Sequence, residues 1–81
     1  MIEFRTLIVT IVRVDKDKLR SDKIVMPIIA SNERKALEIL RKSCYVGDFV
    51  IFPSGKKYRR VKGGFRECTE EDEAELIAST L

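Results

Sequence analysis

The sequence predicts a small α+β domain: a single antiparallel β-sheet of four or five strands with two helices, in the order β-β-α-β-β-β-α. The apolar residues change from a repeat of two to a repeat of about 3.6 at Ser31, and again at Thr69. The chain has 81 residues, enough for one core but not for two. We therefore expect residues 1–81 to form a single domain.

The first two strands are expected at residues 2–14 and 24–30. The first is rich in β-branched residues and carries apolar side chains on both faces, which indicates a central strand. The segment 15–23 has no hydrophobic period and predicts a solvated, mobile loop. Pro27 cannot donate a backbone hydrogen bond, so the second strand should either lie at an edge of the sheet or carry a bulge.

A helix is expected at residues 32–43, with Ser31 as its N-cap. Four side chains share one stripe of this helix and should face the core: Ala36, Leu37, Leu40 and Cys44.

Three further strands are expected at residues 49–52, 57–62 and 65–68. Gly63-Gly64 is typical of a two-residue hairpin turn, which would place Arg60 opposite Glu67.

The last helix is expected at residues 70–80, capped by Thr69. Its first turn is acidic, which stabilises the positive end of a helix dipole without any ligand. We expect it to be structural rather than a recognition surface, docked through one apolar face: Ala74, Ile77, Ala78 and Leu81.

The residue types present argue against an enzyme. The chain has no histidine, which excludes a Ser-His-Asp triad, a His-activated cysteine and a His-based zinc site. Cys44 and Cys68 lack the spacing of a zinc or redox motif, and Cys68 is better explained as a small buried residue. We expect no catalytic residues, no cofactor and no metal.

The sequence also carries no membrane or secretion signal that we recognise. No apolar run approaches 18 residues, and the first residues lack the pattern of a signal peptide. We expect a cytoplasmic protein that does not associate with membranes.

Charge is strongly segregated near the C-terminal end. Residues 56–66 carry a net charge of +6, and residues 67–81 a net charge of −6. The basic segment interleaves its cations with Tyr58 and Phe65, a composition suited to contacting phosphates and stacking on bases. The alternative is a solvated hairpin whose cations only keep an exposed edge soluble. In either case we expect such exposed cations to contribute little to stability.

Several positions over roughly residues 4–68 resemble a small phage-encoded anti-CRISPR protein of the type I-F inhibitor group. They are the Ala30-Ser31 junction, then Ala36, Ile39 and Lys42, and later a Tyr, Gly, aromatic, Cys order that includes Tyr58, Phe65 and Cys68. The family's basic residue near the last hairpin falls on Gly64 here, and the acidic C-terminal helix has no counterpart in it.

This resemblance implies a non-enzymatic inhibitor that occupies the nucleic-acid-binding surface of a host CRISPR-Cas surveillance complex, with Lys42 at the position of a contacting lysine. The partner would be a host Cas protein or ribonucleoprotein. The alternative is a small basic protein that contacts phosphates of DNA or RNA through the 56–66 hairpin. The candidate partner-binding residues are Lys35, Arg41, Lys42, Tyr58, Arg59, Arg60, Lys62, Phe65 and Arg66.

Overall fold

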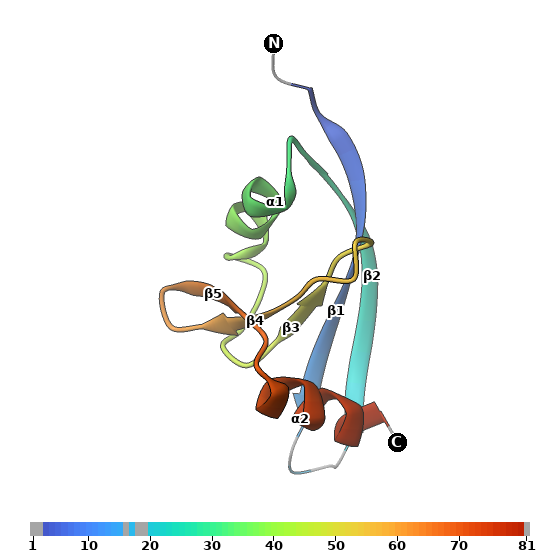
Figure 1. Ribbon diagram of the computed structural model, residues 1–81, viewed down its shortest axis with the longest axis vertical. Helices are drawn as coiled ribbons and strands as arrows, with labels where there is room; N and C mark the ends of the chain where they lie inside the picture. Colours follow the sequence, from blue (N-terminus) through green and yellow to red (C-terminus); the bar gives the residue numbers. More distant parts are fainter. Residues whose placement is uncertain (1–2, 16, 18–19, 81) are drawn as a thin grey trace.

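A computed structural model describes residues 3–15, 17 and 20–80 of the chain (Figure 1). Five strands form one antiparallel sheet, and two helices pack on it in the expected order. The α+β fold class predicted from the sequence is therefore confirmed. The elements are β1 (Arg5–Asp15), β2 (Arg20–Ala30), α1 (Glu33–Leu40), β3 (Phe49–Ile51), β4 (Lys57–Val61), β5 (Gly64–Glu67) and α2 (Glu70–Thr80).

The strand order in the sheet is β2-β1-β3-β4-β5. β1 lies between β2 and β3, as its two apolar faces predict. β2 forms one edge of the sheet, which is the position expected for a strand that contains Pro27. β1 and β2 pair over their full length and form a long ribbon that dominates the shape of the molecule (Figure 1).

The β1–β2 ribbon extends further than the sequence pattern indicates. Segment 15–23 was expected to be a loop, but Asp15 pairs with Arg20 and Val12 pairs with Lys23. The ladder continues here because backbone hydrogen bonding between antiparallel strands does not require apolar side chains. Within that segment, residues 16, 18 and 19 lie outside the described residues.

Helix α1 begins one residue later than expected and is shorter than the predicted 32–43. The N-cap is Asn32, not Ser31: its backbone is extended, and its side-chain oxygen accepts a 2.9 Å hydrogen bond from the N–H of Lys35. Asparagine and serine are both good N-caps, so composition alone does not separate adjacent candidates.

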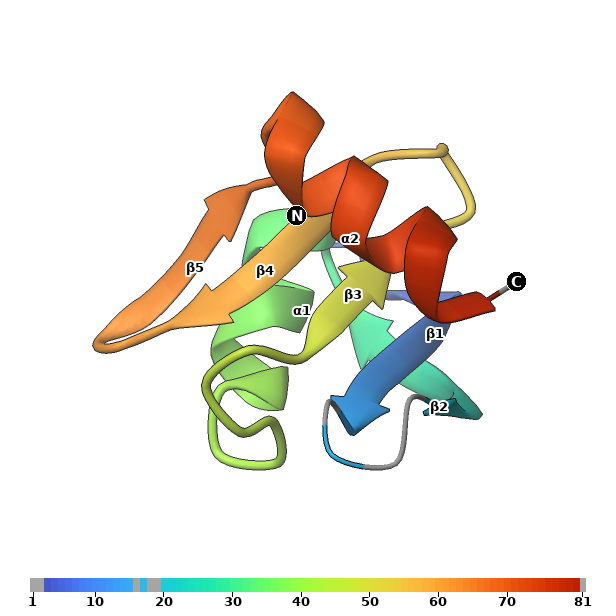
Figure 2. The same cartoon turned by 90° about the horizontal axis from the view of Figure 1, so that it is seen from below.

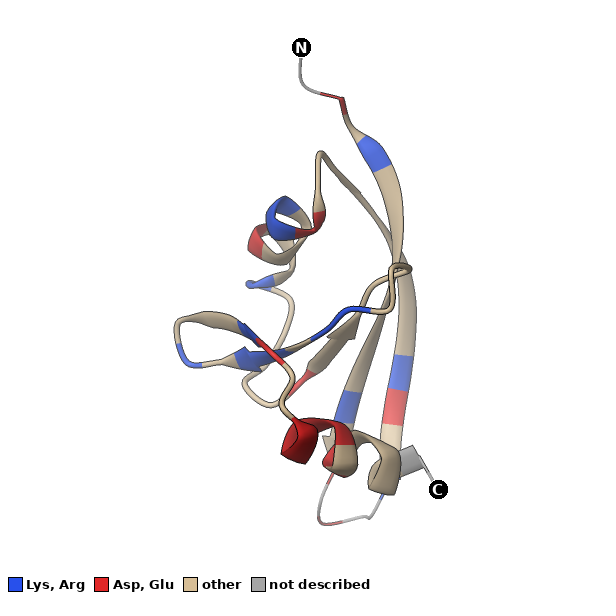
Figure 3. Cartoon of the chain, in the orientation of Figure 1, with Lys and Arg blue, Asp and Glu red and all other residues tan. Residues whose placement is uncertain are grey.

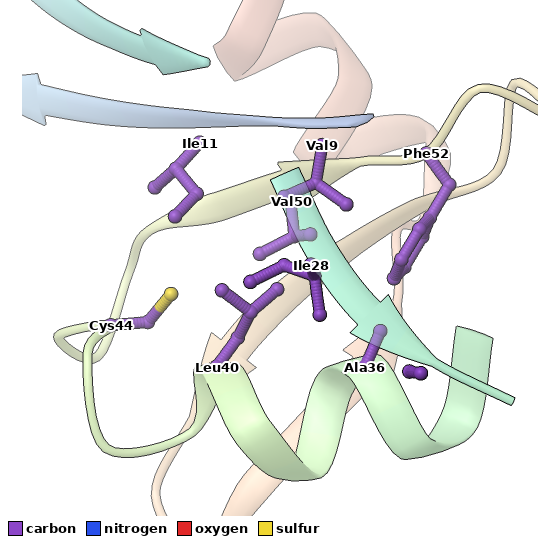
Figure 4. Packing of buried hydrophobic residues seen from close by; sticks show 9 residues of the cluster. Val9, Ile11, Ile28, Ala36, Leu40, Cys44, Val50 and Phe52 are labelled. Atoms are coloured by element: carbon purple, nitrogen blue, oxygen red, sulfur yellow. The ribbon is translucent and has the colours of Figure 1, made fainter. Parts of the chain in front are cut away.

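The larger part of the core lies between α1 and the sheet (Figure 4). The predicted stripe of α1 is confirmed, because Ala36, Leu40 and Cys44 are buried and Leu37 is partly buried. They pack against Val9, Ile11, Ile28, Ala30, Val50 and Phe52 from the strands.

Helix α2 packs on the opposite face of the sheet. Leu76 of α2 is buried in a smaller cluster with Val12 and Phe49. Val12 follows Ile11, and Phe49 precedes Val50, so pleating directs these side chains away from α1. In Figure 2, α2 lies in the foreground, with α1 behind β3 and β4.

The face by which α2 docks was predicted incorrectly. Ile77 is 60% exposed, and Ala74 and Ala78 are also exposed, whereas Leu76 is only 7% exposed. Leu81 lies outside the described residues. The face that packs on the sheet carries Leu76 and also Asp72, whose carboxylate forms ion pairs with Arg59 and Arg66.

The β4–β5 hairpin turns one residue earlier than predicted. Val61 pairs with Gly64, so Lys62 and Gly63 form the turn, and Gly64 begins β5. Gly63 has a φ of 91°, a conformation that favours glycine. Arg60 is consequently opposite Phe65 instead of Glu67, and Glu67 is opposite Tyr58.

Neither α1 nor α2, within the residues that the structure describes, is long and apolar enough to cross a lipid bilayer.

Candidate functional site

Arg59 of the basic hairpin is engaged by the acidic helix. Its guanidinium donates to Asp72 at 2.9 Å and to Glu75 at 2.7 Å, and lies 4.8 Å from the centre of the Phe49 ring. These contacts leave its side chain 17% exposed. The hydrogen bond to Glu75 is the largest cause that raises the pKa of Arg59. Figure 3 shows the acidic start of α2 beside the cationic segments of β4 and β5.

Asp72 is the centre of this network and is only 3% exposed. It accepts hydrogen bonds from Arg66, from Arg59, and from both the N–H and the hydroxyl of Thr69. The Thr69 hydroxyl in turn accepts from the Asp72 N–H, so the pair caps α2 reciprocally, as expected for Thr69. The Arg66 contact is the main cause that holds the pKa of Asp72 well below its usual range, with the Thr69 N–H next.

The α2 contacts reduce the number of hairpin cations available to a partner. Lys57 pairs with Glu73 at 3.3 Å, in addition to the ion pairs of Arg59 and Arg66. A cation already paired with a carboxylate must break that contact before it can bind a phosphate. Arg59 is not an exposed cation, because its ion pairs are largely buried, so the expectation that exposed hairpin cations contribute little to stability does not apply to it.

Tyr58 and Arg60, two more of the candidate partner-binding residues, contact other parts of the fold. Tyr58 packs against the core, edge-on to Phe52, with ring centres 5.6 Å apart. The Arg60 guanidinium lies 5.7 Å from the centre of the Phe65 ring and donates to the carbonyls of Val61 and Gly64. Its Nε atom also donates to the Arg41 carbonyl at 3.3 Å. Arg60 therefore ties the hairpin to the C-terminal end of α1.

Between α1 and the β4–β5 turn lies an open groove of about 360 Å³, which we call the α1–turn groove. Phe65 and Leu37, both half-buried, supply its apolar lining. The full lining is Arg34, Leu37, Glu38, Arg41, Gly63, Gly64 and Phe65. The structure thus brings together Arg41 and Phe65, two predicted partner-binding residues that are 24 positions apart in the sequence.

The cations around α1 and the β4–β5 turn are mostly unpaired. Among the described residues, no hydrogen bond or ion pair engages the charged groups of Arg34, Arg41, Lys42 or Lys62, and all four residues are exposed. Lys35 differs, since it lies 3.5 Å from Glu38. Within the described part of the chain, unpaired positive charge is therefore present around α1 and the turn, as it is at Arg5, Arg20, Lys23 and Lys56, while the hairpin cations that face α2 are neutralised.

Arg34 is the cationic groove residue that the sequence-based site omitted, together with Leu37, Glu38, Gly63 and Gly64. It precedes Arg41 by seven positions, two helical turns, with Leu37 and Glu38 between them on the same face. This spacing could have been detected in the sequence, but the turn that completes the groove could not.

A second cleft, of about 350 Å³, lies near Arg13, Tyr45 and Asp48, and its charges are compensated. Arg13 donates to the buried Asp48 at 2.9 Å, and its guanidinium lies 4.3 Å from the centre of the Tyr45 ring. The Arg59 guanidinium at this cleft is held by α2. This cleft offers an anionic ligand less free charge than the α1–turn groove does.

The cysteines show no sign of activation. Burial is the main cause that raises the pKa of both Cys44 and Cys68 above the usual thiol value, and both thiols are free. A raised pKa disfavours the thiolate, which is the nucleophilic form. No group of three or more Cys, Asp or Glu side chains within the described part of the chain could hold a metal ion.

Comparison of the chain with protein-family models, with curated proteins and with solved structures gave no match.

Proposed function

We propose that the protein is a non-enzymatic binding protein that contacts the phosphate groups of a nucleic acid through the α1–turn groove. The observation that supports this is the distribution of free cations. Arg34, Arg41, Lys42 and Lys62 are exposed and unpaired among the described residues, and the first two line the groove. Unpaired cations grouped on one side of a small domain favour phosphate binding.

The more specific form of this proposal is inhibition of a CRISPR-Cas surveillance complex, in which the protein occupies the nucleic-acid-binding surface of the ribonucleoprotein. The resemblance to type I-F inhibitors suggests it, and the position of Lys42 is compatible with it. Lys42 lies just beyond the end of α1, exposed and next to Arg41 in the sequence. A guide RNA held in such a complex would present the phosphates that the groove cations contact.

The alternative, phosphate binding by the 56–66 hairpin alone, has less support. Lys57, Arg59 and Arg66 are paired with α2. Among the described residues of this segment, Lys56 and the turn residue Lys62 are the cations that remain exposed and unpaired. A nucleic-acid-binding function is therefore better assigned to α1 and the turn together.

The test is a binding titration with labelled nucleic acid, either free or within a preassembled guide-RNA complex. We expect Arg34→Ala/Arg41→Ala to weaken binding and to flatten its salt dependence by about 0.7 per lost contact on a single strand. The matched control, Arg20→Ala/Lys23→Ala, removes two exposed cations from β2 and should bind like the unmodified protein. Equal loss in both variants would indicate non-specific attraction and contradict the proposed site.

If the protein binds only the assembled complex, and if Lys42→Ala loses that binding, the inhibitor function is favoured. Salt-dependent binding to free nucleic acid that Lys42→Ala leaves unchanged would favour the simpler binding protein.

A further inference from the structure

The α1–turn groove differs from a simple basic patch because cations lie at its ends and apolar surface lies between them. Arg34 lies in α1 and Arg41 is its C-cap, seven residues further on, which corresponds to about 10 Å along the helix axis. Leu37 lies between them, and Phe65 faces the same groove from β5. Phosphates would be attracted to the two ends, whereas the middle suits an apolar or aromatic group.

Glu38 strengthens this distinction. It lines the groove between the two arginines, where its carboxylate would repel a phosphate placed at the centre. The same carboxylate can accept a hydrogen bond from an N–H group on the edge of a base, such as the N3–H of thymine or an exocyclic amino group. The charges of the groove therefore favour a base in the middle over a continuous run of phosphates.

Gly64 leaves the groove open at the hairpin. Unlike Gly63, it does not have the positive φ that favours glycine, and a Cβ placed on it would meet no atom within 4 Å. Its backbone therefore needs no glycine, and the missing side chain leaves space over the strand for a flat ligand. The volume of about 360 Å³ is within the range of small-molecule sites.

From these features we infer that the groove accepts one unpaired base of a single-stranded nucleic acid, seated against Phe65, Leu37 and the Gly63–Gly64 backbone. Arg34 and Arg41 would hold phosphates on either side. A duplex cannot supply such a base without unstacking it, so single strands are preferred. This inference rests on the proposed function, because it assumes a partner that carries phosphates.

The first experiment compares a short oligothymidylate with an abasic strand of the same length and charge. We expect the abasic strand to bind about 5-fold or more weakly, the lower end of what one base–aromatic stack contributes. Phe65→Leu, which keeps apolar bulk but removes the ring, should reduce binding of the oligothymidylate and leave binding of the abasic strand unchanged. Equal affinity for the two strands would overturn the inference but leave phosphate binding intact.

A graded series at Gly64 provides the second measurement. Gly64→Ala, Gly64→Val and Gly64→Leu add increasing bulk where space is open, and β-branched residues are tolerated in strands. We expect affinity for the oligothymidylate to fall in that order, with thermal melts confirming that each variant is folded. Unchanged affinity across folded variants would show that no base enters the groove. If neither strand binds the unmodified protein, the proposed function itself fails.

Discussion

The Nη1 atom of Arg59 lies 2.9 Å from Oδ1 of Asp72, and this contact joins β4 to the C-terminal helix. Asp72 and Arg59 are both largely buried, at 4% and 17% side-chain exposure. The acidic helix is therefore an internal partner of the basic hairpin, and much of the charge segregation in the sequence is compensated within the fold.

Removing this contact should destabilise the protein far more than removing a free cation. Arg59→Ala leaves the buried Asp72 carboxylate with only its Arg66 and Thr69 donors, and losing a charged hydrogen-bond partner at a buried group costs about 1–3 kcal/mol. Lys62→Ala, the control on the same hairpin, should change the free energy of unfolding by less than about 0.5 kcal/mol. Urea denaturation measures both, and equal effects would show that the Arg59 contact is not a stabilising one.

The stability that Asp72 contributes should depend on pH. Its folded-state pKa lies below the unfolded value of about 3.9, because Arg66, Thr69 and Arg59 stabilise the carboxylate. The contribution is therefore fully present above that pH and is lost as the pH falls towards the folded-state pKa. We expect the difference in melting temperature between the unmodified protein and Asp72→Asn to be largest near neutral pH and to shrink below about pH 4. A constant difference from neutral to strongly acidic pH would contradict this assignment.

Neighbouring positions of α2 should respond very differently to truncation. Leu76 is buried against Val12 and Phe49, so Leu76→Ala should cost about 2–5 kcal/mol. Ile77 is 60% exposed, and Ile77→Ala should cost less than about 0.5 kcal/mol. Thermal or chemical denaturation of the two variants compares them directly. A larger loss of stability in Ile77→Ala than in Leu76→Ala would mean that α2 docks through the face that its apolar periodicity predicts.

The two glycines of the hairpin should also differ. Gly63 has a φ of 91°, so Gly63→Ala places a side chain in a left-handed conformation at a cost of about 1–2 kcal/mol. Gly64→Ala introduces neither that strain nor a contact within 4 Å, and should be neutral within about 0.5 kcal/mol. Denaturant midpoints of the two variants test the assignment of Lys62-Gly63 as the turn, since a Gly63-Gly64 turn would make Gly64→Ala costly as well.

Elements defined by a local pattern were predictable from the sequence. The stripe of α1 follows from the helical period, and the edge position of β2 follows from Pro27, because both depend on residues close in the chain. The turn was misplaced by one residue because two adjacent glycines fit either register, and only pairing with Val61 distinguishes them.

The orientation of α2 depends on contacts between separate elements, which no local sequence pattern predicts. Apolar periodicity favoured the face with Ile77, but Arg59 and Arg66 attract Asp72 towards the sheet. The candidate site was only partly predictable for the same reason. The cations were evident in the sequence, but which of them α2 neutralises depends on distances between separate elements.

Different interactions attach the two helices to the sheet, so the two helices should detach from it under different conditions. The α1 side is a continuous apolar cluster, whereas α2 is attached through one buried leucine and a group of ion pairs. Acid weakens the second kind of attachment but not the first. Amide hydrogens in α2 should therefore exchange with solvent through a local opening that leaves β1 and β3 protected. At strongly acidic pH, below about pH 4, the C-terminal helix would detach while the α1-covered sheet remains folded.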